Sequence, residues 1–221
     1  MVAVAASLCR GVRSSQQTRR PSAAATIALS VESWTRSTSL RFAQGKPLDV
    51  ERWALKVPKV FNIRLAIDAD RDPVWQIFHE VVAAGDTYAF DPQMSREDAL
   101  AYWFRRDTHT YVTEADGKTV GTYILRPNQS GPGSHIANAA FMVPSSARGQ
   151  GVGRCMAEHC LSEARRLGFR AMQFNFVVAT NQSAIHLWQQ LGFKIVGTLP
   201  GAFRHPEKGY VDVYVMFRSL V

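Results

Sequence analysis

The segment Arg148-Gly149-Gln150-Gly151-Val152-Gly153 combines residue types that are suited to binding phosphate. Its three glycines let the backbone turn tightly and approach a ligand closely. It lies between an expected strand ending near Val143 and an expected helix beginning at Val152. A helix N-terminus presents free N–H groups and the positive end of a dipole, and Arg148 and Arg154 add charge at both ends. The segment therefore predicts a site for a di- or polyphosphate held mainly by main-chain amides.

Two common phosphate-binding loops do not fit this segment. A P-loop requires Gly-Lys-Ser/Thr after four variable positions, but the residue five positions after Gly149 is Arg154. A dinucleotide fingerprint would also need glycine at position 154, and an acidic residue about 20 positions further on. Residues 169–173 contain no acid. Two interpretations of the segment remain. It is either a phosphate-binding loop of another kind or a glycine-rich turn that binds no ligand.

The pattern R-G-Q-G-V-G after Phe-Met-Val resembles the coenzyme A pyrophosphate loop of the GNAT superfamily of N-acetyltransferases. A second segment, from Asn181 to Lys194, is similar to the family's N-x-x-A-x-x-L-Y-x-x-x-G-F pattern, with Trp188 in place of the tyrosine. The two segments have the family's relative spacing, and the resemblance covers about residues 60–217. It implies acetyl-CoA as co-substrate, no metal, and direct transfer of the acetyl group to an amine.

The resemblance also implies roles for particular residues. A main-chain N–H near Met142 would polarise the thioester carbonyl, so Met142 is assigned to the catalytic group. The implied coenzyme A contacts are Phe141, Met142, Val143, Arg148, Gly149, Gln150, Gly151, Val152, Gly153, Arg154, Asn181 and Trp188.

A closer likeness lies within the superfamily. The segments 121–128, 134–139, 174–175 and 180–182 are similar to the fungal acetyltransferases of azetidine-2-carboxylate and related proline analogues. This likeness implies that Asn138, Asn175 and Asn181 line the acceptor side, with Asn138 and Asn175 also counted as catalytic. Asn181 also suits the N-cap of a helix, and the two roles are compatible.

The acceptor wall of the family follows its first helix, where this chain has Tyr88 and Phe90. Both are therefore expected to bind the acceptor, with packing in the core as the alternative. Arg204 and His205 fall in an expected loop, where they would meet either solvent or a substrate carboxylate.

No acid–base pair is evident from the sequence. The strand expected at 135–143 contains no Asp or Glu, although many relatives use a carboxylate to remove the amine's proton. His135 is either a base or a partly exposed residue at the strand end. Trp188 cannot act as an acid, because an indole N–H does not give up its proton. Proximity and polarisation are therefore expected to dominate catalysis.

Periodicity and turn residues predict the elements that position these groups. The expected order is β-α-α-β-β-β-α-β-α-β-β, an α/β GNAT fold with a mixed, mostly antiparallel central sheet flanked by helices. Asp116-Gly117 between two alternating runs predicts a hairpin, and Ser95 predicts a helix start. The last two strands are expected at 193–198 and 210–217.

Charge and composition exclude several classes of protein. The net charge of the 221 residues is +8, but residues 1–50 hold seven basic residues against two acidic ones. The excess therefore belongs mainly to this segment, which weakens a nucleic-acid interpretation. No apolar run approaches the ~20 residues that span a bilayer. The three cysteines, Cys9, Cys155 and Cys160, match no zinc spacing and indicate a reducing compartment.

Two regions are predicted. Residues 1–56 form a basic extension, disordered by composition, and residues 57–221 form the acetyltransferase domain. A cytoplasmic enzyme with an incidental extension is preferred, and a mitochondrial transit peptide is the alternative. The expected partner is a small-molecule amine acceptor, without nucleic acid or membrane, and the resemblance admits a homodimer. Competing functions are acetylation of a peptide or protein amine or of an antibiotic, and a non-catalytic acyl-CoA-binding module.

Overall fold

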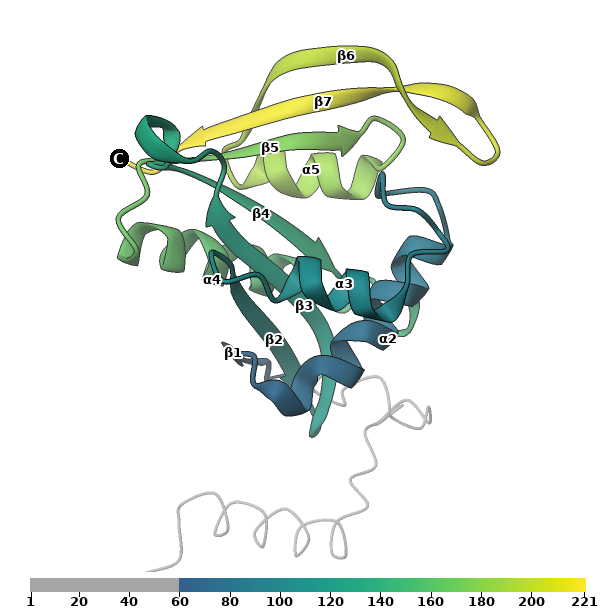
Figure 1. The fold of residues 1–221 in the computed structure, drawn as a ribbon. Helices are drawn as coiled ribbons and strands as arrows, with labels where there is room; N and C mark the ends of the chain where they lie inside the picture. Colours follow the sequence, from purple (N-terminus) through teal and green to yellow (C-terminus); the bar gives the residue numbers. More distant parts are fainter. Residues whose placement is uncertain (1–59) are drawn as a thin grey trace, which may run out of the picture. The chain divides into compact units, whose positions relative to one another are not determined.

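The computed structural model describes residues 60–221, which are coloured in Figure 1. The predicted extension, residues 1–56, lies outside the described residues. The order of the main elements is the predicted one, and the predicted α/β architecture with a mixed, mostly antiparallel sheet flanked by helices is confirmed. The strands are β1 Asn62–Leu65, β2 His109–Ala115, β3 Lys118–Pro127, β4 Ile136–Met142, β5 Ala171–Val178, β6 Lys194–His205 and β7 Gly209–Ser219. The α-helices are α2 Arg71–Ala83, α3 Arg96–Trp103, α4 Val152–Arg166 and α5 Gln182–Gln190.

The described strands form one sheet in the order β1-β2-β3-β4-β5-β7-β6. Every neighbouring pair is antiparallel except β4 and β5, which are parallel. This pair is in register only at Ile136 with Ala171 and at Ala137 with Met172. Both strands continue beyond these residues without pairing with each other, so they diverge. The divergence leaves main-chain groups of β4 free of a partner strand, which is the condition for binding a ligand in the gap.

Alternate residues of the sheet belong to two separate cores, because successive side chains of a strand point to opposite faces. Val112, Ile124 and Met142 pack with α2 and α3. Tyr123, Leu125 and their neighbours pack with α4 and α5 on the opposite face. Figure 1 shows α2 and α3 on one side of β2 to β4 and α4 on the other. Helices therefore cover both faces of the sheet beside the gap.

Local signals in the sequence account for several boundaries. Asp116 and Gly117 have φ values of 51° and 72°, the left-handed backbone of a two-residue hairpin between β2 and β3. The Oγ of Ser95 accepts a hydrogen bond from the Asp98 N–H and caps α3. The Oδ1 of Asn181 accepts one from the Ala184 N–H and caps α5, as predicted.

Strand β6 is longer than predicted. It continues past Thr198 to His205, with irregular register between Leu199 and Phe203. The Asp212 carboxylate accepts a hydrogen bond from the Gly201 N–H, which fastens the irregular stretch to β7. Proline has no N–H to donate to a neighbouring strand. Because β6 lies at the edge of the sheet and pairs only with β7, Pro200 is tolerated there. Arg204 and His205 therefore lie at a strand end and not in a loop, and His205 is buried.

Candidate functional site

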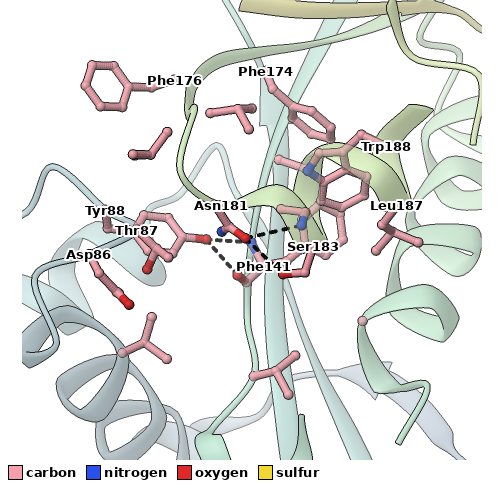
Figure 2. Close-up of a pocket in the computed structure, with 18 of the residues that line it drawn as sticks. Asp86, Thr87, Tyr88, Phe141, Phe174, Phe176, Asn181, Ser183, Leu187 and Trp188 are labelled. Atoms are coloured by element: carbon pink, nitrogen blue, oxygen red, sulfur yellow. Dashed lines mark hydrogen bonds between the residues drawn. The ribbon is translucent and has the colours of Figure 1, made fainter. Parts of the chain in front are cut away.

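A cavity of about 1080 Å³ lies where β4 and β5 diverge. The loop between α2 and α3, the N-terminus of α4 and the N-terminus of α5 close its other sides, as Figure 2 shows in part. Most of the residues assigned from the sequence line it: Tyr88, Phe90, Asn138, Phe141, Val143, Arg148, Gly149, Gly151, Val152, Gly153, Arg154, Asn175, Asn181 and Trp188. The structure thus brings together residues that are up to 100 positions apart in the sequence.

The glycine loop forms one end of this cavity. Gly149 and Gly151 have φ values of 72° and 88°, a backbone that other residues rarely adopt. Gly151 is the N-cap of α4, and the first turn of this helix contains no acidic side chain. Its free N–H groups and dipole therefore favour an anion, with the exposed guanidinium groups of Arg148 and Arg154 nearby. These features fit the pyrophosphate of coenzyme A.

Two of the assigned coenzyme A residues do not line the cavity. Met142 is fully buried in the core beneath α2 and α3. The side-chain amide of Gln150 donates to the Ser146 carbonyl, 2.7 Å away, within its own loop.

The main chain that faces the gap belongs to Phe141. The Tyr88 hydroxyl donates to the Phe141 carbonyl at 2.6 Å and accepts from its N–H at 3.0 Å (Figure 2). Backbone groups of neighbouring residues in an antiparallel strand point to opposite sides, so the N–H of Met142 points toward β3. The main-chain N–H near Met142 that faces the gap is therefore that of Phe141. Burial raises the pKa of Tyr88, so its hydroxyl remains protonated and available as a donor.

Trp188 has a packing role beyond the paired residues of β4 and β5, where the two strands have diverged. Its ring centroid lies 5.0 Å from that of Phe141 and 4.6 Å from that of Phe174, and only 8% of the residue is exposed. These contacts join β4 to β5 through α5. The indole thus supports the walls of the cavity, which agrees with its inability to serve as an acid.

Two of the three asparagines assigned to the acceptor, Asn138 and Asn175, lie on facing walls. The Asn138 amide donates to the Gln173 carbonyl at 2.8 Å and so bridges β4 and β5. The Asn175 amide donates to the side chain of Asn128 at 2.7 Å, and its oxygen accepts from Gln173 at 2.8 Å. This network fixes both amides beside the cavity. An amide can orient an amine or a water but cannot take a proton at neutral pH.

The carboxylate that the sequence did not reveal is Asp86. It is the one acid among the described residues that line the cavity, and its Oδ1 is buried without a hydrogen-bond partner there. The Oγ1 of Thr87 is likewise buried and has no hydrogen-bond partner among the described residues. Figure 2 shows both beside Tyr88, on the loop that follows α2. An Asp after Gly85 is typical of an ordinary turn, so the sequence held no signal for this position.

One histidine of the described residues, His205, lines this cavity. The Nδ1 of His205 accepts hydrogen bonds from the main-chain N–H groups of Glu207 and Lys208. His135 is exposed and lies outside the lining residues. Over residues 60–221, no cluster of His, Cys, Asp or Glu could hold a metal, and no helix is long and apolar enough to cross a membrane.

Comparisons with known proteins agree with this geometry. The family model described as "Acetyltransferase (GNAT) family" matches residues 75–193. The chain is 33% identical over 184 residues to N-acetyltransferase aca1 of Schizosaccharomyces pombe, covering 76% of this chain and 88% of that protein. It is 26% identical over 143 residues to the L-amino acid N-acyltransferase MnaT of Escherichia coli, and the match covers 63% of this chain and 83% of that protein.

A solved structure extends the comparison to the fold. The GCN5-related N-acetyltransferase from Kribbella flavida is 45% identical, with a TM-score of 0.70, and the match covers 72% of this chain and 97% of that one. The divergent β4 and β5, the glycine loop at α4 and these matches together lead to one conclusion. The chain belongs to the GNAT family of acetyltransferases.

Proposed function

We propose that the protein transfers the acetyl group of acetyl-CoA directly to the amine of a small amino or imino acid. The observation that carries this proposal is a single cavity with two chemically different ends. The coenzyme A loop, residues 148–154, lies at one end, and the side-chain amides of Asn138 and Asn175 lie at the other. The likeness to the fungal proline-analogue enzymes and the name of the Escherichia coli relative support a small acceptor.

The donor is held mainly by main-chain groups. Amides at the start of α4 would bind the pyrophosphate, and the unpaired edge of β4 would bind the pantetheine arm. The Phe141 N–H faces the gap, so it would polarise the thioester carbonyl in exchange for its bond to the Tyr88 hydroxyl. Phe141 thus takes the role that the sequence assigned to Met142.

The transfer itself requires a proton acceptor. The amine nitrogen forms a bond to the carbonyl carbon, the carbon–sulfur bond breaks, and the thiolate of coenzyme A leaves and takes a proton from water. A neutral amine must lose one proton as the amide forms, and an ammonium must first lose another because it has no free lone pair. Asp86 is the acid within the described lining of the cavity, so we assign it the task of accepting that proton, directly or through a water.

Replacing Asp86 by Asn tests this assignment. Removal of a general base slows transfer by about 10²–10⁴-fold, so Asp86→Asn should lower kcat in this range while the dissociation constant of acetyl-CoA stays the same. Asp91→Asn is the matched control, because Asp91 lies on the same loop but outside the cavity and only caps a turn at Gln93. Thiol release by Asp86→Asn at the wild-type rate would remove Asp86 from the mechanism.

A further inference from the structure

A second, smaller cavity of about 420 Å³ adjoins the first. Three residues line both cavities, namely Arg126, Asn138 and Asn175. The rest of the small cavity is polar apart from Pro127, since its other lining residues are Arg105, Asp107, Asn128, Gln129, Ser130 and Ser134. Because it opens on the asparagine side, away from the glycine loop, it extends the acceptor end of the site.

Two nitrogens of the Arg126 guanidinium differ in their hydrogen bonding. Its Nη2 donates to the Tyr102 hydroxyl at 2.7 Å, and its guanidinium carbon lies 4.8 Å from the centre of the same ring. These contacts hold the planar group in place. Its Nη1 is buried and has no hydrogen-bond partner among the described residues. A buried N–H of a permanent cation favours an anionic acceptor strongly.

No acid of the described chain forms an ion pair with Arg126. The acid of the small cavity, Asp107, instead accepts from Arg105, at 3.1 Å from Nε and 2.8 Å from Nη2. Although burial opposes it, the hydrogen bond from Arg105 and the charges of Arg105 and Arg126 hold the pKa of Asp107 below its ordinary range. Asp107 is thus ionised and paired, and the small cavity retains one positive charge.

The position of Arg126 relates it to the reacting end of the site. Arg126 on β3 lies opposite Asn138 on β4. Asn138 precedes Phe141 by three residues of the same strand. Three residues of a strand span ~10 Å. An aromatic wall covers this distance: the rings of Tyr102 and Phe90 are 5.0 Å apart, and those of Phe90 and Tyr88 are 5.7 Å apart. An α-amino or α-imino acid carries its carboxylate on the same carbon as its amine, so the Arg126 side chain would reach along this wall toward it, while the thioester would occupy the space beside Phe141.

We propose that Arg126 binds the carboxylate of the acceptor through its Nη1, at the junction of the two cavities. This rests on the proposed function and makes it more specific, because the acceptor must then carry an anion beside its amine. The Nη1–H group donates to a carboxylate oxygen, while Tyr102 keeps the guanidinium oriented. Asn138 and Asn175 flank the same junction and would select the direction in which the acceptor enters.

The experiment compares matched acceptors on the full-length protein. Thiol release from acetyl-CoA is measured with azetidine-2-carboxylate and with azetidine-2-carboxamide, and with an L-amino acid and its amide. A hydrogen bond to a charged group corresponds to about a 10- to 100-fold preference. The wild type should therefore favour each carboxylate by this factor in kcat/KM. Arg126→Met should lose the preference through a higher KM for the carboxylates, with little change for the amides.

Arg106→Met is the control, because Arg106 is exposed and lines neither cavity. Arg126→Lys, which keeps the charge, should restore part of the preference, and thermal melts of each variant establish that it is folded. An unchanged carboxylate-to-amide ratio in folded Arg126→Met would overturn the assignment. Calorimetry of both acceptors with the protein–coenzyme A complex gives the same comparison without turnover. Equal affinity of the complex for the carboxylate and for its amide overturns the role of Arg126. Failure of every tested amine to release thiol from acetyl-CoA overturns the proposed function.

Discussion

Asn138 acts at the point where β4 and β5 part. One N–H of its amide is committed to the Gln173 carbonyl, so its oxygen and its second N–H remain to orient an amine or a water. The same bond holds the two strands together at the start of the gap. A single side chain thus links the position of the acceptor to the geometry of the sheet.

Asn138→Ala should therefore lower kcat by about tenfold or more, since a misplaced acceptor loses the benefit of proximity. The dissociation constant of acetyl-CoA should stay within twofold, because the glycine loop is distant along the cavity. Steady-state kinetics and calorimetry measure the two quantities. Asn62→Ala is a suitable control, as Asn62 is exposed and contacts only Glu114 through its side chain. A large loss of acetyl-CoA binding with kcat intact would place Asn138 on the donor side.

At the scale of elements, the glycine loop and α4 form one unit. Gly151 is both the N-cap of α4 and a residue with a φ of 88°, so its backbone conformation fixes where the helix begins. Gly153 lies one residue inside the helix, and an added Cβ would be 3.8 Å from Leu187, an ordinary contact. Two neighbouring glycines of one motif thus have different physical requirements.

Gly151→Ala should cost about 1–2 kcal/mol of folding stability, because an L-residue is strained in the left-handed region. It should also weaken acetyl-CoA binding, since the first N–H groups of α4 shift. Gly153→Ala should leave the free energy of unfolding almost unchanged. Urea denaturation of both variants makes the comparison. Equal destabilisation by the two substitutions would show that backbone strain does not distinguish them.

Most elements were predictable because periodicity and caps operate locally. Asp116-Gly117, Ser95 and Asn181 each determine a boundary through contacts within a few residues. The length of β6 was not predictable, because it depends on pairing with β7 and on the contact between Gly201 and Asp212. The sequence around Pro200 resembles a turn, and tertiary pairing overrides it.

For the whole molecule, the donor end of the site followed from the sequence far better than the acceptor end. A phosphate loop is a contiguous motif, so its residues are read together. Asp86 and Arg126 come from different elements and meet the cavity only through the folded sheet. Phe141 and Met142 are adjacent in β4, and their main-chain N–H groups point to opposite sides of the strand. A sequence motif does not indicate which of the two faces the gap.

The most direct test of the account is thiol release from acetyl-CoA with a panel of amines. The panel contains azetidine-2-carboxylate, other proline analogues, primary L-amino acids, aminoglycosides and peptides. The account predicts release with small amino or imino acids that carry a free carboxylate, and acetylation at the amine when products are examined by mass spectrometry. Release with none of the amines, despite tight binding of acetyl-CoA, would contradict it, and release with peptides alone would contradict the small acceptor.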